Sequence, residues 1–289
     1  MNMMRLLIQR HRSKSGSLIF HCHNKAERVR RKLTEMKGRI TIMNKWYAHQ
    51  KNIDNSNVNL ICFSYAGGSA SYFAPWGRCL PEGFGMIPIL YPMRELRSGE
   101  DMPETAEELA AQIVGEAREI FEKPFIIYGH CTGAVIAYET ACLLKKECGL
   151  TAELFVTSSE PSPRMTKINP RTLEMSDEEF IEYAINLKLL DRTMAENKDF
   201  MDYYFSCFKS DFLLHQRYDP AGKETPLECP VIAMRGNDDI LSNDEIIIDW
   251  KNYTDDFTFR KFDGEHFFIN QHSAEIIELI AEKYTSLHS

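Results

Sequence analysis

The sequence of 289 residues lacks several features that would place it in a simple class. No stretch approaches the roughly 20 consecutive apolar residues of a membrane-spanning helix, so we expect no membrane association. No internal repeat or low-complexity tract is visible, which argues against a fibrous or disordered chain. No two of the eight cysteines have CxxC spacing, so neither a zinc site nor a thioredoxin-like redox motif is supported. We therefore expect no metal or cofactor, and reduced, mostly buried thiols in a cytoplasmic protein.

Acidic residues are scarce at the N-terminus and abundant elsewhere. Residues 1–42 contain eleven Lys or Arg and two acidic residues, whereas the rest of the chain has a net charge of −17. This acidic balance argues against nucleic acid as a partner. A secretory signal is disfavoured because the basic stretch has no sufficiently long apolar run. A transit peptide is an alternative, since the stretch is rich in arginine and poor in acidic residues, although clear amphipathic periodicity is missing. We favour Met43 as the biological start, with residues 1–42 as an extension outside the fold.

Short apolar runs alternate with helical patterns from Val58 onwards. Strands are predicted at 58–63, 86–91, 125–128, 154–157, 231–235 and 257–262. Helical spacing is found at 104–121 and 134–146, and a last helix begins at about Ser273. The alternation predicts an α/β fold in one domain over 43–289, with helices on both faces of a mostly parallel sheet.

One long connection between predicted strands contains no strand pattern of its own. It runs from about Glu160 to Cys229, with a capping box at 176–179 and helical segments at 180–187 and 195–208. About 70 residues is long for a simple connection. We predict an inserted helical lid over about 160–225, with ordinary crossover helices as the alternative.

The turn Gly129-His130-Cys131-Thr132-Gly133 lies between a predicted strand and a predicted helix. A nucleophile in such a turn has a strained backbone, and a glycine two residues away on either side removes side chains that would collide there. The N-terminus of the helix also favours a thiolate. We therefore predict that Cys131 is a nucleophile; a buried cysteine in a tight turn is the alternative. His130 should point away from the thiol and shape the turn.

Candidate partners for Cys131 follow later strands in the order nucleophile, acid, histidine. Asp239 comes after the strand at 231–235, with Asp238 as its rival, and His266 comes after the strand at 257–262. Acyl transfer also needs two backbone N–H groups that bind an oxyanion. One is expected at Thr132 and the other in the glycine-containing loop 66–68.

Six segments in a fixed order resemble the type II thioesterases that accompany nonribosomal peptide and polyketide synthases. They are FSYAGGSASYF (63–73), YPMRELR (91–97), GHCTGAVIAYE (129–139), KSDFLLHQRYD (209–219), RGNDD (235–239) and FDGEHFF (262–268). The resemblance runs from about residue 59 to the C-terminus. It implies an α/β-hydrolase fold in which Cys131, Asp239 and His266 are nucleophile, acid and base, and Ala66 and Thr132 supply the oxyanion amides.

The same resemblance implies a substrate and a partner. The substrate would be an acyl group on the phosphopantetheine arm of a carrier protein, and its hydrolysis would edit or unload the synthase. Carrier proteins are commonly acidic around the serine that bears this arm, so an acidic enzyme needs a local basic rim. Candidates are Arg94, Arg97, Lys209 and Arg217, with solvated surface charge as the alternative. We expect a monomer without a cofactor of its own.

The chain departs from the family pattern at four positions. Cys131 replaces the usual serine, Thr132 a methionine, Met93 a glycine and Ser64 a proline. A cysteine would exchange one thioester for another, so the acyl enzyme would stay reactive toward amines as well as water. A hydrolase that uses cysteine, a transferase or cyclase, and a serine enzyme mutated to trap its intermediate are therefore all open. A dienelactone-hydrolase-like enzyme would leave YAGGSA and YPMRELR unexplained, and a non-catalytic carrier-binding subunit would not need all three catalytic residue types.

Overall fold

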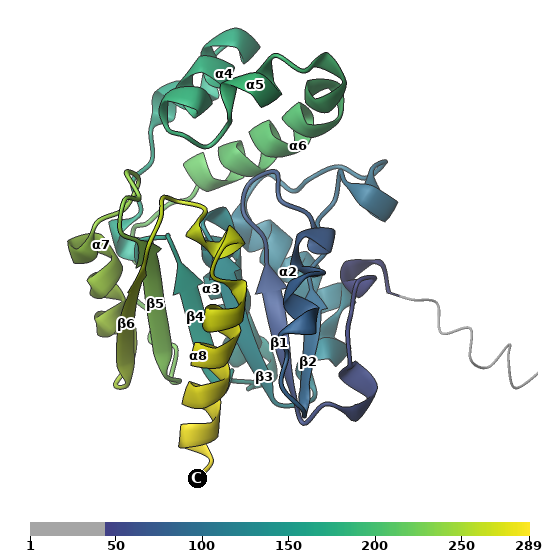
Figure 1. The fold of residues 1–289 in the computed structure, drawn as a ribbon, viewed down its shortest axis with the longest axis vertical. Helices are drawn as coiled ribbons and strands as arrows, with labels where there is room; N and C mark the ends of the chain where they lie inside the picture. Colours follow the sequence, from purple (N-terminus) through teal and green to yellow (C-terminus); the bar gives the residue numbers. More distant parts are fainter. Residues whose placement is uncertain (1–43) are drawn as a thin grey trace, which may run out of the picture. The chain divides into compact units, whose positions relative to one another are not determined.

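The computed structural model describes residues 44–289, so the basic stretch 1–42 lies outside the described residues. Six strands form one sheet in which every neighbouring pair is parallel. They are β1 (Val58–Phe63), β2 (Phe84–Pro88), β3 (Phe125–His130), β4 (Leu154–Ser158), β5 (Val231–Gly236) and β6 (Phe257–Phe262). The order across the sheet is β2-β1-β3-β4-β5-β6 (Figure 1). The predicted α/β fold is confirmed.

The strand order creates a switch point beside β1. The chain passes from β1 to β2 on one side of it and then returns to β3 on the other. In open parallel sheets, the crevice at the carboxyl ends of such strands is where ligands bind. Ala66 follows β1 and Cys131 follows β3, so the topology brings both predicted site residues to this edge.

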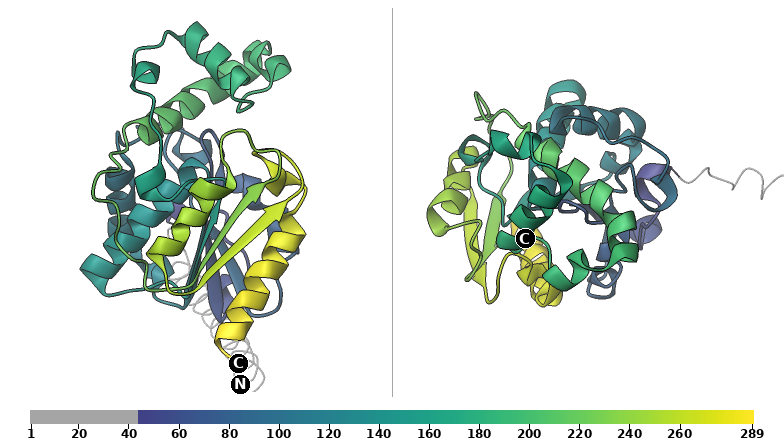
Figure 2. Two further views of the ribbon diagram at one scale, coloured as in Figure 1. Left: turned by 90° about the vertical axis from the view of Figure 1, so that its left-hand side faces the viewer. Right: turned by 90° about the horizontal axis from the view of Figure 1, so that it is seen from above.

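Helices cover both faces of the sheet (Figure 2). One face packs against α2 (Ala106–Glu116), α3 (Thr132–Leu143) and α7 (Asp244–Ile248), and the other against α8 (Ser273–Leu287). Successive strand residues point to opposite faces, and both Leu60 and Ile61 of β1 are fully buried. This explains why β1 reads as a continuous apolar run. Across the described part of the chain, no helix combines the length and the apolar character needed to cross a membrane.

Several predicted elements have other bounds in the structure; the helical segment predicted at 195–208, for example, continues to Gln216 in α6. The strand predicted at 86–91 is β2, whose residues 84–88 pair with 58–62 of β1. Residues 89–91 are equally buried, but the last bond to β1 is from Ile89 N to the Cys62 carbonyl at 2.9 Å, and Leu90 N already donates to the Trp46 carbonyl. Burial alone therefore did not mark the strand end. The helix predicted at 104–121 divides at Ala117, where φ is −133°, into α2 and a short 3-10 turn.

Residues 159–230, between β4 and β5, form a helical insertion beyond the carboxyl edge of the sheet (Figure 1). It contains α4 (Asp177–Asn186), α5 (Arg192–Ala195) and α6 (Lys198–Gln216). The predicted capping box is present, with Ser176 and Glu179 bonding each other's backbone N–H groups at the start of α4. Phe180, Phe208 and Phe212 pack together with Ala66. The insertion therefore rests on the loop that follows β1.

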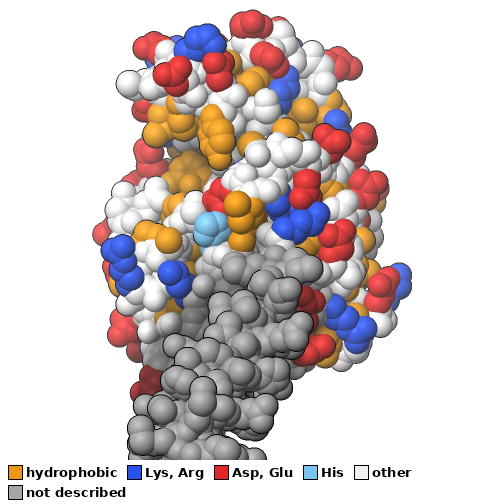
Figure 3. All heavy atoms as spheres, turned by 90° about the vertical axis from the view of Figure 1, so that its right-hand side faces the viewer, with side chains coloured by type: hydrophobic (Ala, Val, Ile, Leu, Met, Phe, Trp, Pro, Cys, Tyr) orange, Lys and Arg blue, Asp and Glu red, His pale blue; other side chains and the backbone are white. Residues whose placement is uncertain are grey.

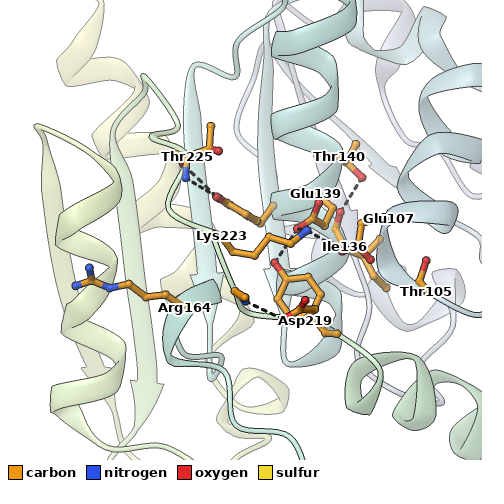
Figure 4. Close-up of polar contacts among 12 residues, drawn as sticks. Thr105, Glu107, Ile136, Glu139, Thr140, Arg164, Asp219, Lys223 and Thr225 are labelled. Carbon is orange, nitrogen blue, oxygen red and sulfur yellow. Dashed lines mark hydrogen bonds and ion pairs between the residues drawn. The ribbon is translucent and has the colours of Figure 1, made fainter.

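The return of the helical insertion to the sheet is fixed by Lys223 (Figure 4). Its Nζ lies 2.7 Å from Glu107 Oε1 of α2 and 2.9 Å from Glu139 Oε1 of α3. The Tyr218 hydroxyl donates to the same Glu139 oxygen at 2.7 Å. Because the two carboxylates belong to helices on the sheet, these contacts hold the C-terminal end of the insertion to the body of the fold.

Candidate active site

Cys131 occupies a strained position between β3 and α3. Its backbone has φ 52° and ψ −134°, a left-handed φ that is rare for residues other than glycine. Its N–H donates to the Ser158 carbonyl at 2.9 Å, and its carbonyl accepts from Ala134 N at 2.8 Å. These bonds hold the conformation, which leaves the thiol partly exposed in front of α3. The predicted strand-turn-helix geometry is present.

The two glycines of this turn have a steric cause. A Cβ at Gly129 would lie 2.5 Å from Ala134 Cα, and a Cβ at Gly133 would lie 2.4 Å from the Phe63 carbonyl oxygen. Both obstacles are backbone atoms, so they cannot move without shifting β1 or α3. The glycine spacing lets α3 begin directly against the end of β1.

Replacing Gly133 by alanine should therefore destabilise the protein by about 1–3 kcal/mol, the usual cost of overpacking. For a domain of this size, each kcal/mol lowers the melting temperature by about 2–4 °C. Gly115→Ala in α2 is the matched control, because nothing lies within 4 Å of its added methyl group and alanine favours a helix. Thermal unfolding measures both variants, and equal melting temperatures would contradict the steric account.

His266 and Asp239 lie side by side in the loops after β6 and β5. His266 Nδ1 is 3.1 Å from Asp239 Oδ2. Asp239 is 3% exposed, and it accepts two further hydrogen bonds, from Leu241 N at 2.9 Å and from the Ser242 hydroxyl at 2.8 Å. Asp238, its predicted rival, is exposed to solvent. The structure thus brings Asp239, and not Asp238, to the histidine.

Charges around His266 favour its protonated form. Burial lowers the pKa of His266, but a thiolate at Cys131 and the hydrogen bond with Asp239 raise that pKa to about 10. Burial likewise raises the pKa of Asp239, yet its bonds to His266 hold the carboxyl pKa well below its usual range. His266 Nε2 is buried and has no hydrogen-bond partner within residues 44–289. The imidazole therefore has one nitrogen fixed by the acid and one free to exchange a proton.

His130 has a contact that its sequence position did not indicate. Its ring packs against His266, with centroids 5.1 Å apart, and its Nδ1 lies 2.9 Å from the Ser158 hydroxyl. Burial and the neighbouring His266 hold the pKa of His130 well below its usual range, so the ring is neutral. Beyond shaping the turn, it forms a wall beside His266.

The predicted oxyanion amides lie beside Cys131. Ala66 and Thr132 line the same cavity as the thiol. Apart from bonds within helices and strands, neither backbone N–H donates a hydrogen bond to a backbone carbonyl of the described residues. Thr132 is the first residue of α3, where N–H groups have no partner within the helix. Both groups are thus available to a substrate oxygen.

A buried ion pair fixes the loop that contains Ala66. Gly67 N donates to Asp211 Oδ2 at 2.8 Å, and Arg94 binds both Asp211 oxygens at 2.7 Å. Arg94 Nη1 also donates to the Gly68 carbonyl at 2.6 Å. Because Asp211 belongs to α6, this pair joins the helical insertion to the oxyanion loop.

The assignment of Arg94 and Arg97 to a surface rim is wrong. Each is 2% exposed, because each guanidinium has partners inside the protein. Arg94 is paired with Asp211. Arg97 lies 3.7 Å from the centre of the Trp46 ring and donates to the Leu90 carbonyl at 2.8 Å. Lys209 is 2.5 Å from Asp177, and Arg217 is exposed. On the face shown in Figure 3, acidic and basic side chains are interspersed over the coloured part of the surface.

A cavity of about 450 Å³ adjoins Cys131 and His266. Its apolar lining comes mainly from the helical insertion and from the segment after β5: Ile168, Leu187, Leu189, Phe208, Phe212, Ile240, Leu241 and Ile246. Two polar residues in it, Glu160 and His215, were missed at the sequence level. They are 55 positions apart and lie 3.0 Å from each other, and no local pattern signals such a pair. Within the described residues, no cluster of three or more His, Cys, Asp or Glu side chains could hold a metal ion.

Residues 58–284 match the Thioesterase domain family. The chain belongs to this family. It is 28% identical over 243 residues to "Thioesterase PikA5" of Streptomyces venezuelae, covering 82% of this chain and 84% of that protein. It is 24% identical over 245 residues to "Gramicidin S biosynthesis protein GrsT" of Aneurinibacillus migulanus, covering 84% and 95%.

Solved structures of thioesterases have the same fold. The type II thioesterase BorB from the borrelidin biosynthetic cluster has a TM-score of 0.71 at 27% identity, covering 78% of this chain and 92% of that one. RedJ, from the prodiginine pathway of Streptomyces coelicolor, also has a TM-score of 0.71, at 28% identity, covering 80% and 86%. These matches confirm the predicted resemblance and the α/β-hydrolase fold. The thioesterase is thus a thioester hydrolase, and the family match decides against the dienelactone-hydrolase-like interpretation.

Proposed function

We propose that this thioesterase releases acyl or peptidyl groups from the phosphopantetheine arm of a carrier protein through an acyl enzyme on Cys131. The observation that carries the proposal is that Cys131 and His266 line one cavity, while Asp239 is bonded to the other nitrogen of His266. The names of its relatives, in gramicidin S and borrelidin biosynthesis, support a role in natural-product synthesis. One chain supplies the nucleophile, the base, the acid and the oxyanion amides, so a monomer suffices. The reaction needs no cofactor of the enzyme's own.

Acylation begins with attack of the Cys131 thiolate on the thioester carbonyl carbon. The carbonyl oxygen becomes negatively charged, and it would be bound by the N–H groups of Ala66 and Thr132, which line the cavity beside Cys131. The bond to the phosphopantetheine sulfur then breaks as His266 Nε2 gives its proton to that sulfur. Asp239 holds the imidazole by Nδ1 and stabilises its positive charge before this transfer. The carrier leaves with a free thiol.

Deacylation uses the same groups in the reverse sense. Neutral His266 takes a proton from water, and the resulting hydroxide attacks the carbonyl carbon of the acyl enzyme. The bond between that carbon and Cys131 Sγ breaks, which returns the thiolate beside a protonated His266. The net reaction converts a thioester and water into a carboxylic acid and a thiol.

The cysteine itself favours a second candidate, acyl transfer. An acyl group on Cys131 is still a thioester, and it remains more reactive toward amines than the oxyester that a serine would form. An amine that enters the cavity could replace water in the second step, with His266 taking its proton. The product would then be an amide.

An assay with loaded carrier proteins tests both candidates. We expect free acid from acetyl- and peptidyl-loaded carrier proteins, seen by small-molecule mass spectrometry, together with unloaded carrier in the intact-protein spectrum. Parallel reactions contain candidate amines, and reactions without enzyme measure spontaneous loss. Amide as the main product would assign transfer. Loaded carriers that persist, with no acyl mass added to the enzyme, would overturn the proposed function.

A further inference from the structure

Glu160 lies in the active-site cavity with a fixed backbone. It follows Ser159, whose φ of 52° turns the chain sharply after β4, and its carbonyl accepts from Trp250 Nε1 at 3.0 Å. The residue lines the cavity although it is only 4% exposed. A carboxylate in such a place is costly unless it is paired.

His215 of α6 is the partner of Glu160. Its Nε2 lies 3.0 Å from Glu160 Oε1, and its Nδ1 lies 3.2 Å from Gln216 Nε2. Since the Gln216 amide nitrogen can only donate, Nδ1 accepts, and Nε2 holds the proton that bonds the carboxylate. Burial lowers the pKa of His215, but Glu160 raises it, and the net direction is upward. The histidine thus holds one oxygen of Glu160 in place.

The other oxygen of Glu160 is uncommitted. The Thr166 hydroxyl lies 3.5 Å from Oε1. Oε2 has no hydrogen-bond partner in the described part of the chain, and it is not one of the fully buried polar atoms that lack a partner. Glu160 Oε2 is therefore an unpaired acceptor in a cavity whose lining holds apolar side chains together with polar ones such as Lys167 and Asn169. A site built to bond a donor rejects an analogue that lacks it, because the acceptor is then left unpaired.

We propose that Glu160, positioned by His215, selects acyl groups that carry an N–H or O–H donor over plain alkyl chains. Glu160 Oε2 would accept the hydrogen bond from a hydroxyl or amino group of the acyl chain. This inference rests on the proposed function, since the acyl group reaches the cavity through its thioester at Cys131.

A matched series of hexanoyl thioesters of N-acetylcysteamine tests the proposal. One member is unsubstituted, three carry a hydroxyl at carbon 2, 3 or 6, and one carries an amino group at carbon 2. We expect at least one donor-bearing substrate to exceed unsubstituted hexanoyl in kcat/KM by about 10- to 100-fold, the range for a hydrogen bond to a charged group. Glu160→Leu should remove this preference by slowing that substrate alone.

The variants separate selection from a structural role. Glu160→Gln keeps the shape, so it should weaken an amino substrate more than a hydroxyl one. The matched control is Glu174→Gln, which changes an exposed carboxylate of the same insertion and should alter nothing. An equal fall for alkyl and donor substrates in Glu160→Leu, or no preference in the wild type, would overturn the inference. Acylation of Cys131 by plain hexanoyl thioester, read by intact mass, reports on the proposed function separately.

Discussion

Cys131→Ala should lower acyl release from a carrier protein by at least about 10⁴-fold, the scale seen when a nucleophile is removed from a triad. The melting temperature should stay close to that of the wild type, because the thiol is partly exposed and its hydrogen bond with the Thr132 hydroxyl is long, at 3.9 Å. Alanine is also no worse than cysteine at a φ of 52°. Single-turnover release, with calorimetry of the same sample, measures both quantities.

Two further outcomes sharpen this test. The wild type, but not the Cys131→Ala variant, should gain the mass of the acyl group when release is quenched early. The matched control is Cys142→Ala, which removes another partly buried thiol away from the cavity lining and should release acyl groups normally. An alanine variant that retains full activity would end the proposed mechanism.

Cys131→Ser then tests what the sulfur contributes. The serine variant would form an oxyester, which is less reactive toward amines, so the ratio of amide to acid should fall in the presence of an amine. Faster hydrolysis with serine would indicate that cysteine serves a reaction other than hydrolysis.

The placement of the site was predictable because its parts are local signals. The turn around Cys131 and the loops with Asp239 and His266 each follow a strand, and the carboxyl ends of parallel strands meet at one edge of a sheet. The choice between Asp238 and Asp239 needed the structure, since adjacent residues of a turn point in different directions. Met93 has a φ of 66°, a conformation that favours glycine, so the glycine of the related pattern is explained by conformation and the methionine is not.

The contacts between distant segments were not predictable. Arg94 and Arg97 were candidates for a basic rim because an acidic enzyme needs one to bind an acidic carrier protein. Their burial depends on Asp211 and Trp46, which lie 117 and 51 positions away in the sequence. Glu160 and His215 meet only because α6 crosses above the end of β4. Such pairs depend on tertiary packing, and neither the composition nor the periodicity of the sequence predicts them.

The Arg94–Asp211 pair gives the second large effect. Arg94→Met should destabilise the fold by about 3–5 kcal/mol, because it leaves the Asp211 carboxylate buried without its partner. Both side chains are at most 3% exposed, so solvent cannot replace the lost contact. Denaturant unfolding measures the change. The matched control is Arg192→Met, which breaks a bidentate pair with Glu182 in the same insertion and should cost less than about 1 kcal/mol, since that pair is exposed.

The activity of Arg94→Met should fall more than its loss of stability explains, because Arg94 fixes the Asp211 carboxylate, and that carboxylate holds Gly67 N, next to the Ala66 amide. The double variant Arg94→Met/Asp211→Leu separates the two effects. Removing both charges should recover much of the lost stability, since no buried charge is left unpaired. It also removes the acceptor for Gly67 N, so the loop that contains Ala66 should be misplaced and kcat should remain low. A double variant that regains both stability and kcat would show that the ion pair only supports the fold. Recovery of stability alone would assign the pair to positioning Ala66, and would make the helical insertion part of the catalytic geometry.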